Sequence, residues 1–280
     1  RSVSRGLGDV YKRQVYTMNK KLLKYILIGI TISICIILLG TRKERKENSP
    51  APRDYAEIIK EGVLRAVTEY NSVSYHIIND TIEGFDYALL HAFAQDKGIK
   101  LEITPEMSFE KRLQGILEGK YDLLATGTLV NTQSKDSLLF TQTLILSKQV
   151  LVQRKKETDS LYIDNQLELA HKTLHVIKNS PALLRIHNLM EEIADTIYIE
   201  EVELYGAEQL LAMVSEGDID YAVCDENIAK SALADFPNLD ISTYISFTQF
   251  YAWGVNKHSP VLLDSLNSWL NSYMETKEYQ

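Results

Sequence analysis

Apolar and polar residues follow two recurring patterns along most of the chain, short apolar runs and longer amphipathic segments. EGKYDLLATG at residues 118–127 matches EGDIDYAVCD at 216–225, because each has a Glu-Gly turn, an Asp three residues after the Gly and then an apolar run. Each copy follows an amphipathic helical pattern, FEKRLQGIL from Phe109 and AEQLLAMVS from Ala207. A helix, a tight turn and a buried strand form half of an α/β crossover. The repeat therefore predicts two lobes built alike.

The surrounding pattern alternates strands and helices in both halves of the chain. Short loops force parallel strands with right-handed crossovers. Ligands of open α/β sheets bind beyond the carboxyl ends of the strands, so we expect Gly127 and Asp225 to face each other across a cleft. The predicted strands are 63–68, 99–105, 121–127, 173–179, 196–202, 219–225 and 239–245, with helices at 84–98, 109–120, 181–193, 207–215 and 226–236, then a strand and a long helix near the end.

The amino-terminal residues carry the pattern of an export segment. Residues 1–17 fit no structural pattern, and we interpret them as a non-native leader before Met18. A basic stretch and a charge-free run then predict a signal peptide or membrane anchor at 18–40, with membrane contact through 22–40. Lipid attachment at Cys35 is disfavoured because Ile34 precedes it. Residues 41–60 are polar and proline-containing, and we expect a linker there.

Composition and charge exclude several classes of function. The chain is 45% apolar and 24% charged, which is ordinary for a globular protein. Beyond residue 46 it has 19 Lys and Arg against 36 Asp and Glu, a net charge of −17, so nucleic acid is not an expected partner. With two cysteines and no phosphate loop, serine-hydrolase or zinc-protease motif, we expect no cofactor, no metal site and no catalytic residue.

The order of these segments resembles that of a known family. VLRAVT, GFDYALLHAFAQDKGIKLEI, GKYDLLATGTLVN and FTQTLILSKQVLV, in this order, are similar to the bacterial solute-binding proteins of family 3, the extracytoplasmic receptors of amino-acid transporters. The stretch from GDIDYAVCDENIAK to LNSWL resembles more closely the non-catalytic amino-terminal module of membrane-bound lytic transglycosylase F.

The resemblance implies a two-lobed periplasmic-binding-protein-like fold of type II. Each lobe would be a small, mostly parallel sheet flanked by helices, and two crossing strands would form the hinge. Carried onto this chain, lobe 1 would be 61–146 plus 247–280, and lobe 2 would be 147–246. The crossings would lie near 144–149 and 242–248.

The resemblance also implies that an ammonium group of the ligand is held from both lobes. Glu69 follows the first strand, where an acidic residue of the family faces the pocket. Gly127 would offer its backbone carbonyl to the ammonium, and Asp225 occupies the position of the lobe 2 carboxylate that pairs with it. A solvated Glu69 and an Asp225 that only caps the following helix remain open alternatives.

Four further residues complete the expected site. Ser180 sits where backbone N–H groups and the helix dipole hold a carboxylate, and Lys178 lies beside it. Asn71 and Tyr75, in the loop after the first strand, would line the pocket. Packing within the fold is the alternative for Tyr75, since the chain has 16 tyrosines.

One departure from the family pattern concerns the ligand. Amino-acid receptors of the family read G-x-T-x-T-x-E-R, and the Arg clamps the ligand α-carboxylate in a bidentate pair. Here Ser134 replaces that Arg and Leu129 replaces the pocket Thr, while Lys135 cannot form the planar fork. The retained carboxylates favour an amine-bearing ligand with a less dominant carboxylate, such as a peptide or a muropeptide fragment.

Two main functions follow from the sequence. The first is an extracytoplasmic, non-catalytic binding module for an amino acid, peptide or muropeptide, with an ABC transporter permease or peptidoglycan as partner. The second is the regulatory front half of a lytic transglycosylase F, because the sequence ends at Gln280 in a helix that looks unfinished. The coding sequence beyond Gln280 would discriminate between them. A ligand-sensing ectodomain held by residues 25–40 is a third alternative. All three expect a periplasmic or extracytoplasmic location, membrane-anchored or secreted.

Overall fold

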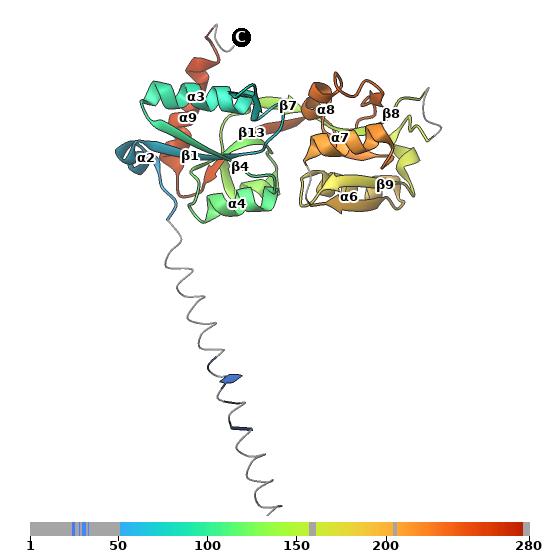
Figure 1. Cartoon of the computed structure of the whole chain (residues 1–280), viewed down its shortest axis with the longest axis horizontal. Helices are drawn as coiled ribbons and strands as arrows, with labels where there is room; N and C mark the ends of the chain where they lie inside the picture. The colour runs from blue at the N-terminus through green and yellow to red at the C-terminus, as the bar shows by residue number, and fades with distance from the viewer. Residues whose placement is uncertain are drawn as a thin grey trace, which may run out of the picture. The chain divides into compact units, whose positions relative to one another are not determined.

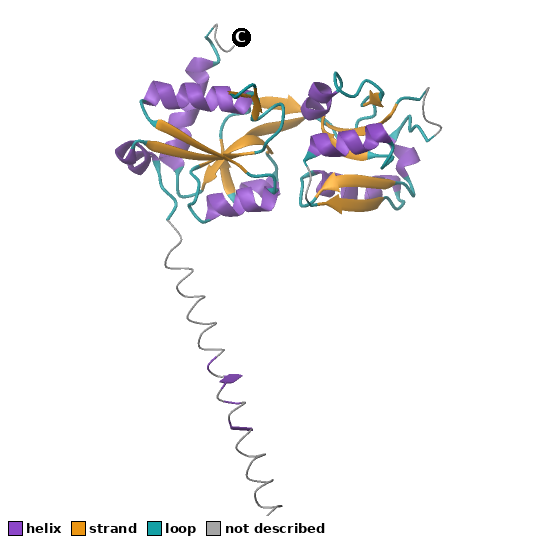
Figure 2. Ribbon diagram, in the orientation of Figure 1, coloured by secondary structure: helices purple, strands orange, loops and turns teal. Residues whose placement is uncertain are grey.

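The computed structural model describes residues 51–156, 161–203 and 206–276, together with six single helical residues between 24 and 33 (Figures 1 and 2). The expected leader at 1–17 and most of the expected signal or anchor at 18–40 lie outside the described residues. Within the described part of the chain, no helix has the length and hydropathy needed to span a bilayer. Residues Pro50–Gln280 form one compact unit, and its described residues make up two lobes.

Lobe 1 is a sheet of strand order β4-β1-β5-β13-β6, with β7 paired to β13. β1 pairs in parallel with β4 and β5, whereas β13 pairs antiparallel with its neighbours. Helices α2, α3 and α9 pack on one face, and α4 covers the other (Figure 1). The bounds are α2 Tyr55–Glu61, β1 Val63–Thr68, α3 Phe85–Lys97, β4 Lys100–Pro105, α4 Phe109–Leu117, β5 Leu123–Leu129, α5 Thr132–Lys135, β6 Leu138–Phe140, β7 Ile145–Ser147, β13 Gln249–Asn256 and α9 Pro260–Tyr273.

Lobe 2 is a second sheet, of order β10-β9-β11-β8-β12. Its first three strands are parallel and β8 is antiparallel to β11, so both lobes place their parallel strands in the order second, first, third, followed by an antiparallel strand. The prediction of two α/β lobes built alike is confirmed. The bounds are β8 Gln149–Arg154, η1 Gln166–Leu169, β9 Thr173–Ile177, α6 Ala182–Ile193, β10 Tyr198–Val202, α7 Ala207–Glu216, β11 Ala222–Asp225, α8 Glu226–Ala232 and β12 Leu239–Asp240.

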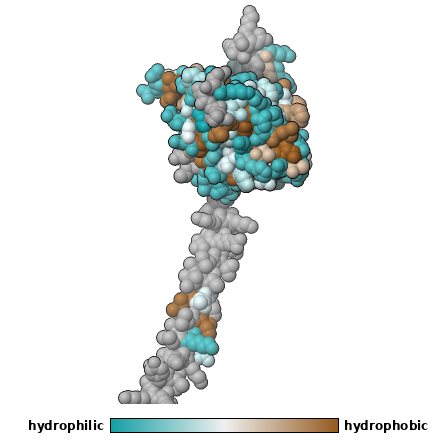
Figure 3. Space-filling view, turned by 90° about the vertical axis from the view of Figure 1, so that its right-hand side faces the viewer, coloured by the Kyte–Doolittle hydropathy of each residue, from teal (hydrophilic) through white to brown (hydrophobic). Residues whose placement is uncertain are grey.

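The end of the molecule formed by lobe 2 carries a mostly hydrophilic surface. Figure 3 shows this face, with hydrophobic residues in small groups between hydrophilic ones. Groups of this kind are normal on a soluble domain.

The chain passes between the two sheets twice, and the two passages are hydrogen-bonded side by side. It leaves β7 at Ser147 and enters β8 at Gln149, and it returns to β13 after Ser246. The backbone N–H of Gln149 donates to the Ser246 hydroxyl at 2.8 Å, and the Gln149 carbonyl accepts from the Ile245 N–H at 2.8 Å. Of the strand expected at 239–245, only β12 is formed. The later residues make isolated backbone hydrogen bonds to the start of β8, where the chain passes between the lobes, and do not form a continuous ladder.

The loop expected after β1 contains a small hairpin that the sequence reading missed. β2 (His76–Ile78) pairs antiparallel with β3 (Thr81–Glu83). Asn79 and Asp80 join the strands with φ of 49° and 61°. Asn and Asp adopt this left-handed conformation more readily than most residues, and positive φ at both central positions suits a tight hairpin turn.

The prediction of a linker at 41–60 is wrong for its last residues, which belong to a helix. α2 begins after Asp54, whose side chain accepts from the helix N-terminus while Glu57 reaches back to the Asp54 N–H. This reciprocal capping box fixes the start of the helix. Ile58 is fully buried in the core of lobe 1, so folded structure begins before residue 60.

A buried ion pair fastens this amino-terminal segment to the sheet. The Asp122 carboxylate accepts from Arg53 Nε at 3.0 Å and also from Arg53 Nη2. Its Oδ2 accepts in addition from the backbone N–H of Arg65 in β1, at 2.8 Å. The Arg53 and Asp122 side chains are 8% and 1% exposed, so neither charge has water as an alternative partner.

We predict that Asp122→Asn destabilises the protein by up to about 3–5 kcal/mol, because Arg53 loses its buried carboxylate partner and keeps only Glu61, which is half-exposed. The free energy of unfolding in urea measures this. The matched control is Glu102→Gln, which breaks an exposed pair with Lys100 and should leave the free energy of unfolding nearly unchanged. Equal losses for the two variants would contradict the prediction.

A second buried carboxylate belongs to the core of lobe 1. Asp86, in the first turn of α3, is 1% exposed, and its Oδ1 accepts from Trp253 Nε1 of β13 at 2.6 Å. Burial raises the pKa of Asp86 to about 7, and the charge of Glu69 adds to that rise, while Trp253 and nearby Ser74 oppose it. The ionised form is therefore unfavourable in the folded state.

A pH dependence of stability results from this burial. An Asp whose pKa is raised by folding binds a proton in the folded state but not in the unfolded state between about pH 4 and 7, so stability rises as the pH falls through that range. We predict that Asp86→Asn stabilises the protein relative to wild type at pH 8 more than at pH 5. Urea unfolding at both pH values measures the difference. Asp96→Asn, on the exposed side of α3, is the control, and a stability difference for Asp86→Asn that does not change with pH would refute the prediction.

Candidate ligand-binding site

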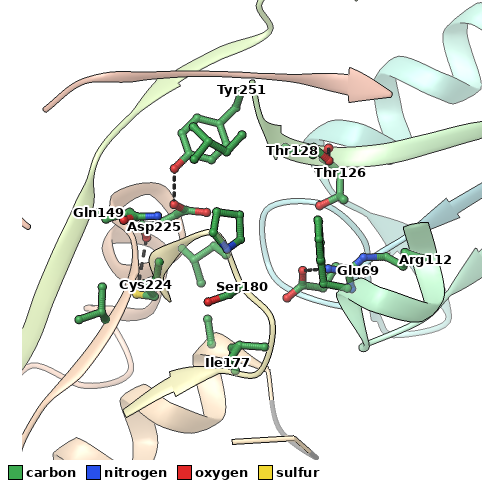
Figure 4. Close-up of a pocket in the computed structure, with 18 residues that line it drawn as sticks. Glu69, Arg112, Thr126, Thr128, Gln149, Ile177, Ser180, Cys224, Asp225 and Tyr251 are labelled. Carbon is green, nitrogen blue, oxygen red and sulfur yellow. Dashed lines mark hydrogen bonds and ion pairs between the residues drawn. The ribbon is translucent and has the colours of Figure 1, made fainter. Parts of the chain in front are cut away.

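A cleft of about 680 Å³, open to solvent, lies between the two lobes (Figure 4). We call it the main cleft. Lobe 1 contributes the loop after β1, the start of α4 and the end of β5, and lobe 2 contributes the end of β9, the start of α6 and the end of β11. The carboxyl ends of both parallel sheets therefore meet at this place, as the strand order requires.

Glu69 and Asp225 lie on opposite sides of the main cleft (Figure 4). Glu69 follows β1 in lobe 1, and Asp225 is the last residue of β11 in lobe 2. The two lobes thus each present a carboxylate to the same space.

Asp225 does not cap the helix that follows it. It occupies the N-cap position of α8, but its side chain makes no capping hydrogen bond. Its Oδ1 accepts instead from the hydroxyl of Tyr251 in lobe 1, at 2.5 Å. Burial raises the pKa of Asp225 to about 6 and the charge of Glu69 adds to the rise, whereas the Tyr251 hydrogen bond lowers it. The carboxylate therefore faces the cleft with a hydroxyl as its partner and no cation.

Glu69 has a cationic partner that the sequence reading missed. Arg112 Nη2 of α4 donates to Glu69 Oε2 at 2.9 Å, and the Arg112 side chain is 5% exposed. Arg112 also donates to the backbone carbonyls of Glu106 and Met107. The guanidinium is thus held by lobe 1 itself, and it balances the charge of Glu69.

Gly127 lines the main cleft, but it does not end its strand. β5 continues to Leu129, so the strand end predicted at Gly127 is two residues early. The pairing of β5 with β13 changes register between Thr128 and Leu124, because β13 is irregular between Ala252 and Gly254. Gly127 lies within this interruption of the ladder.

Ser180 lines the cleft close to the start of α6, although the helix begins later than predicted. The helix runs from Ala182, the N-cap residue is Pro181, and no side chain caps it. Pro181 has φ of −59° and ψ of −19°, so its backbone already has the right-handed helical conformation one residue before α6 begins.

Ser134 occupies the position of the family's arginine and supplies no positive charge there. The Ser134 hydroxyl donates to the Leu129 carbonyl at 2.9 Å and accepts from the Asn131 N–H at 3.0 Å. It thus completes the turn before α5, while Leu129 presents an apolar side chain to the cleft.

Of the other expected site residues, Asn71 lies beside the main cleft, whereas Tyr75 and Lys178 lie away from it. Asn71 is buried, its Oδ1 accepts from the N–H groups of Val73 and Ser74, and it lines a smaller space that adjoins the main cleft. Tyr75 is 7% exposed and packs edge-on against Tyr87, away from the main cleft. Lys178 forms an ion pair with Glu203 at 3.1 Å and does not line the cleft.

The residues that the sequence reading missed are polar side chains on apolar faces. Arg112 is three residues after Phe109 and four before Ile116, on the buried face of α4. Asp86 is on the same face of α3 as Leu90. A charged residue at such a position requires a buried partner, and this signal was present in the sequence. Tyr251 and Gln149, which also line the cleft, carry no comparable signal.

A larger space continues from the main cleft between α4, α5 and α6. It encloses about 1670 Å³, part of it open solvent, and shares Phe109, Leu129 and Ser180 with the main cleft. We call it the outer groove. Glu110 of lobe 1 accepts from Asn179 Nδ2 of lobe 2 across it, at 3.1 Å.

Among the described residues, no three His, Cys, Asp or Glu side chains come together in a way that could hold a metal ion. Cys224 also lines the main cleft, and burial raises the pKa of its thiol, which keeps it in the neutral form.

Curated relatives share the chain's sequence over most of its length. Membrane-bound lytic murein transglycosylase F from Photobacterium profundum is 26% identical over 233 residues, which cover 81% of this chain and 43% of the relative. The same-named protein from Pseudomonas putida strain W619 is 27% identical over 240 residues, covering 84% and 47%. The chain thus spans about half the length of these relatives.

Solved structures share the fold. Holo ArgBP from T. maritima matches with a TM-score of 0.70 and 22% identity, over 80% of this chain and 96% of that one. The amino acid ABC transporter substrate-binding protein AbpA from Streptococcus pneumoniae, bound to L-arginine, matches with a TM-score of 0.68 and 21% identity, over 80% and 94%.

The profile of one family matches residues 64–280, which include every strand and helix of both lobes except α2 and the first residue of β1. The chain therefore belongs to the bacterial extracellular solute-binding proteins, family 3.

Proposed function

We propose that the described unit is an extracytoplasmic, non-catalytic binding module that closes on a small amine-bearing ligand. The observation that carries this proposal is the pair of carboxylates, Glu69 and Asp225, on opposite walls of the cleft. Among the described residues Asp225 has no cationic partner, and an ammonium group would supply one. The Gly127 carbonyl, within the interrupted ladder, would accept a second hydrogen bond from the same group.

A carboxylate group of the ligand would be bound less firmly in this site than its amine. The Ser134 hydroxyl donates its hydrogen bond to the Leu129 carbonyl within its own turn, and Arg112 is already paired with Glu69. Backbone N–H groups near Ser180, at the start of α6, would hold a carboxylate or carbonyl oxygen less firmly than a bidentate arginine. This favours a peptide or muropeptide fragment over a free α-amino acid, although the structurally similar AbpA is a protein bound to L-arginine.

The outer groove supports a ligand longer than one residue. It continues from the main cleft past Leu129 to Ser134, the residue that replaces the family's arginine clamp. Its walls combine apolar side chains such as Leu113 and Leu183 with the polar groups of Asn131 and Glu191. Such a mixture suits the body of a peptide whose amino group lies at Asp225.

A second candidate function is the regulatory amino-terminal module of a lytic transglycosylase F. The observation that favours it is the identity of the curated relatives, which are enzymes of this name and which the chain covers over about half of their length. In that case peptidoglycan is the partner, and in the first case it is a transporter permease. Both functions place the module outside the cytoplasm, secreted or held by residues 18–40.

We predict that the protein binds an amine-bearing ligand and that Asp225→Asn weakens this binding by about tenfold or more, because a charge-assisted hydrogen bond is lost. Isothermal titration calorimetry against amino acids, short peptides and muropeptides measures the affinity. Asp235→Asn, an exposed carboxylate of the same lobe, is the matched control and should bind as wild type does. No heat and no thermal shift with any of these compounds would refute the proposal.

We further predict that this polypeptide does not cleave peptidoglycan, because lytic transglycosylases need a general-acid glutamate in a separate domain. Incubation with purified peptidoglycan, followed by chromatography of the soluble products, checks this. Release of anhydro-sugar fragments would contradict it. The mass of the natural protein in its host, seen with an antibody to lobe 2, separates the two candidate functions, since the enzyme would be about twice as long.

A further inference from the structure

A small chamber opens beside the main cleft, on the side of lobe 1. It encloses about 430 Å³, part of it open to solvent, and shares Glu69, Gly127, Asp225 and Tyr251 with the main cleft. We call it the inner chamber. Its lining includes the buried side chain of Asp86 and the hydroxyl-bearing residues Ser74 and Thr126, which are also buried.

Asp86 has an oxygen without a partner. Its Oδ1 accepts from Trp253 Nε1 at 2.6 Å, whereas its Oδ2 is buried and makes no hydrogen bond of normal geometry to a described residue. The Ser74 hydroxyl is near enough to lower the pKa of Asp86, but it is also 3.3 Å from the Thr126 hydroxyl. The whole side chain is 1% exposed. A buried polar atom without a partner costs free energy unless some group completes it.

The charges around the chamber are out of balance. Three carboxylates line it, those of Glu69, Asp86 and Asp225, and no Lys or Arg is found among the described residues that do so. Arg112, which lines the main cleft, balances Glu69. Asp86 and Asp225 remain, each with a neutral donor as its partner, Trp253 and Tyr251 respectively.

The geometry argues against a single metal ion as the missing cation. No three acidic, His or Cys side chains among the described residues come close enough together to hold one. The two uncompensated carboxylates come from different lobes, and Asp225 lines both the main cleft and the inner chamber, whereas Asp86 lines the inner chamber and not the main cleft. Two cationic groups of one molecule match this arrangement.

We propose that the site takes a ligand with two amine cations, one bound at Asp225 in the main cleft and the other reaching into the inner chamber toward Asp86 Oδ2. The ligand is thus an organic diamine, either a simple one or a residue with an α-amine and a side-chain amine. The inference rests on the proposed function and makes it more specific, because that function requires only one amine.

A matched pair of probes tests the second amine. L-Lysinamide and L-norleucinamide have the same α-amine and nearly the same chain, and they differ in the second cation alone. Calorimetric titration of the purified protein near neutral pH should give at least about tenfold tighter binding for lysinamide, the value of one charge-assisted contact. In Asp86→Asn, which keeps an oxygen for Trp253, the ratio of the two affinities should fall to near one.

Asp96→Asn, on the exposed side of the same helix, is the control and should keep the wild-type ratio. Equal affinities of the two probes for the wild type would overturn the second site and leave the proposed function standing. A ratio unchanged in a folded Asp86→Asn, checked by circular dichroism, would also overturn it. Absence of binding for both probes would instead count against the proposed function. The wild-type comparison decides even if the variant does not fold.

Discussion

The hydrogen bond from the Tyr251 hydroxyl to Asp225 joins the two lobes at the floor of the cleft. Tyr251 stands on β13, the antiparallel strand that lies between β5 and β6 of lobe 1, and Asp225 ends the third parallel strand of lobe 2. Each residue is held by a sheet, so the bond fixes the distance between two rigid walls. Contacts between Ser72 and Glu208, and between Glu110 and Asn179, join the lobes at other places. The cleft thus owes its width to polar contacts, which can exchange with a ligand.

The charges in this cleft decide what it can bind. Arg112 is the only cation among its described lining residues, and lobe 1 uses it to balance Glu69 and to hold two carbonyl groups. The remaining charge is acidic, and burial disfavours the ionised form of both Asp86 and Asp225. A cleft with buried, uncompensated carboxylates favours cations and disfavours anions. The lack of an arginine at Ser134 and the acidic character of the cleft therefore act in the same direction, since both disfavour an anionic ligand.

The sequence was sufficient for most of the fold because local signals and the global arrangement agree. FEKRLQGIL predicted the body of α4, since its apolar spacing and the following Glu-Gly turn indicate the same helix, although the predicted helix ran to residue 120 and α4 ends at Leu117. The repeat before Gly127 and Asp225 predicted two lobes with the same strand order. α2 was missed because the two prolines before it suggested a linker, whereas its stability comes from Ile58 and from Arg53, which contact distant residues.

The site was harder to predict because its chemistry depends on partners far apart in the sequence. Glu69 and Asp225 could be placed from strand ends, but the pairing of Glu69 with Arg112 and of Asp225 with Tyr251 could not. Tyr75 was expected to line the pocket, but it packs edge-on against the rings of Tyr70 and Tyr87. The contact with Tyr87 joins residues of a loop and a helix, which a local sequence pattern does not reveal.

The burial of Asp225 makes its ionised form unfavourable unless a cation lies beside it. Folding raises the pKa of Asp225 from its ordinary 3.8 to about 6, which corresponds to a cost of about 3 kcal/mol for keeping the carboxylate ionised at neutral pH. The Tyr251 hydroxyl offsets part of the desolvation, but a hydroxyl carries no charge. An ammonium group between the lobes would restore the lost solvation of the carboxylate and would contact both walls at once. Binding of the proposed ligand would therefore be coupled to the contact of the two lobes through the same carboxylate, and a cation is the group that would stabilise both.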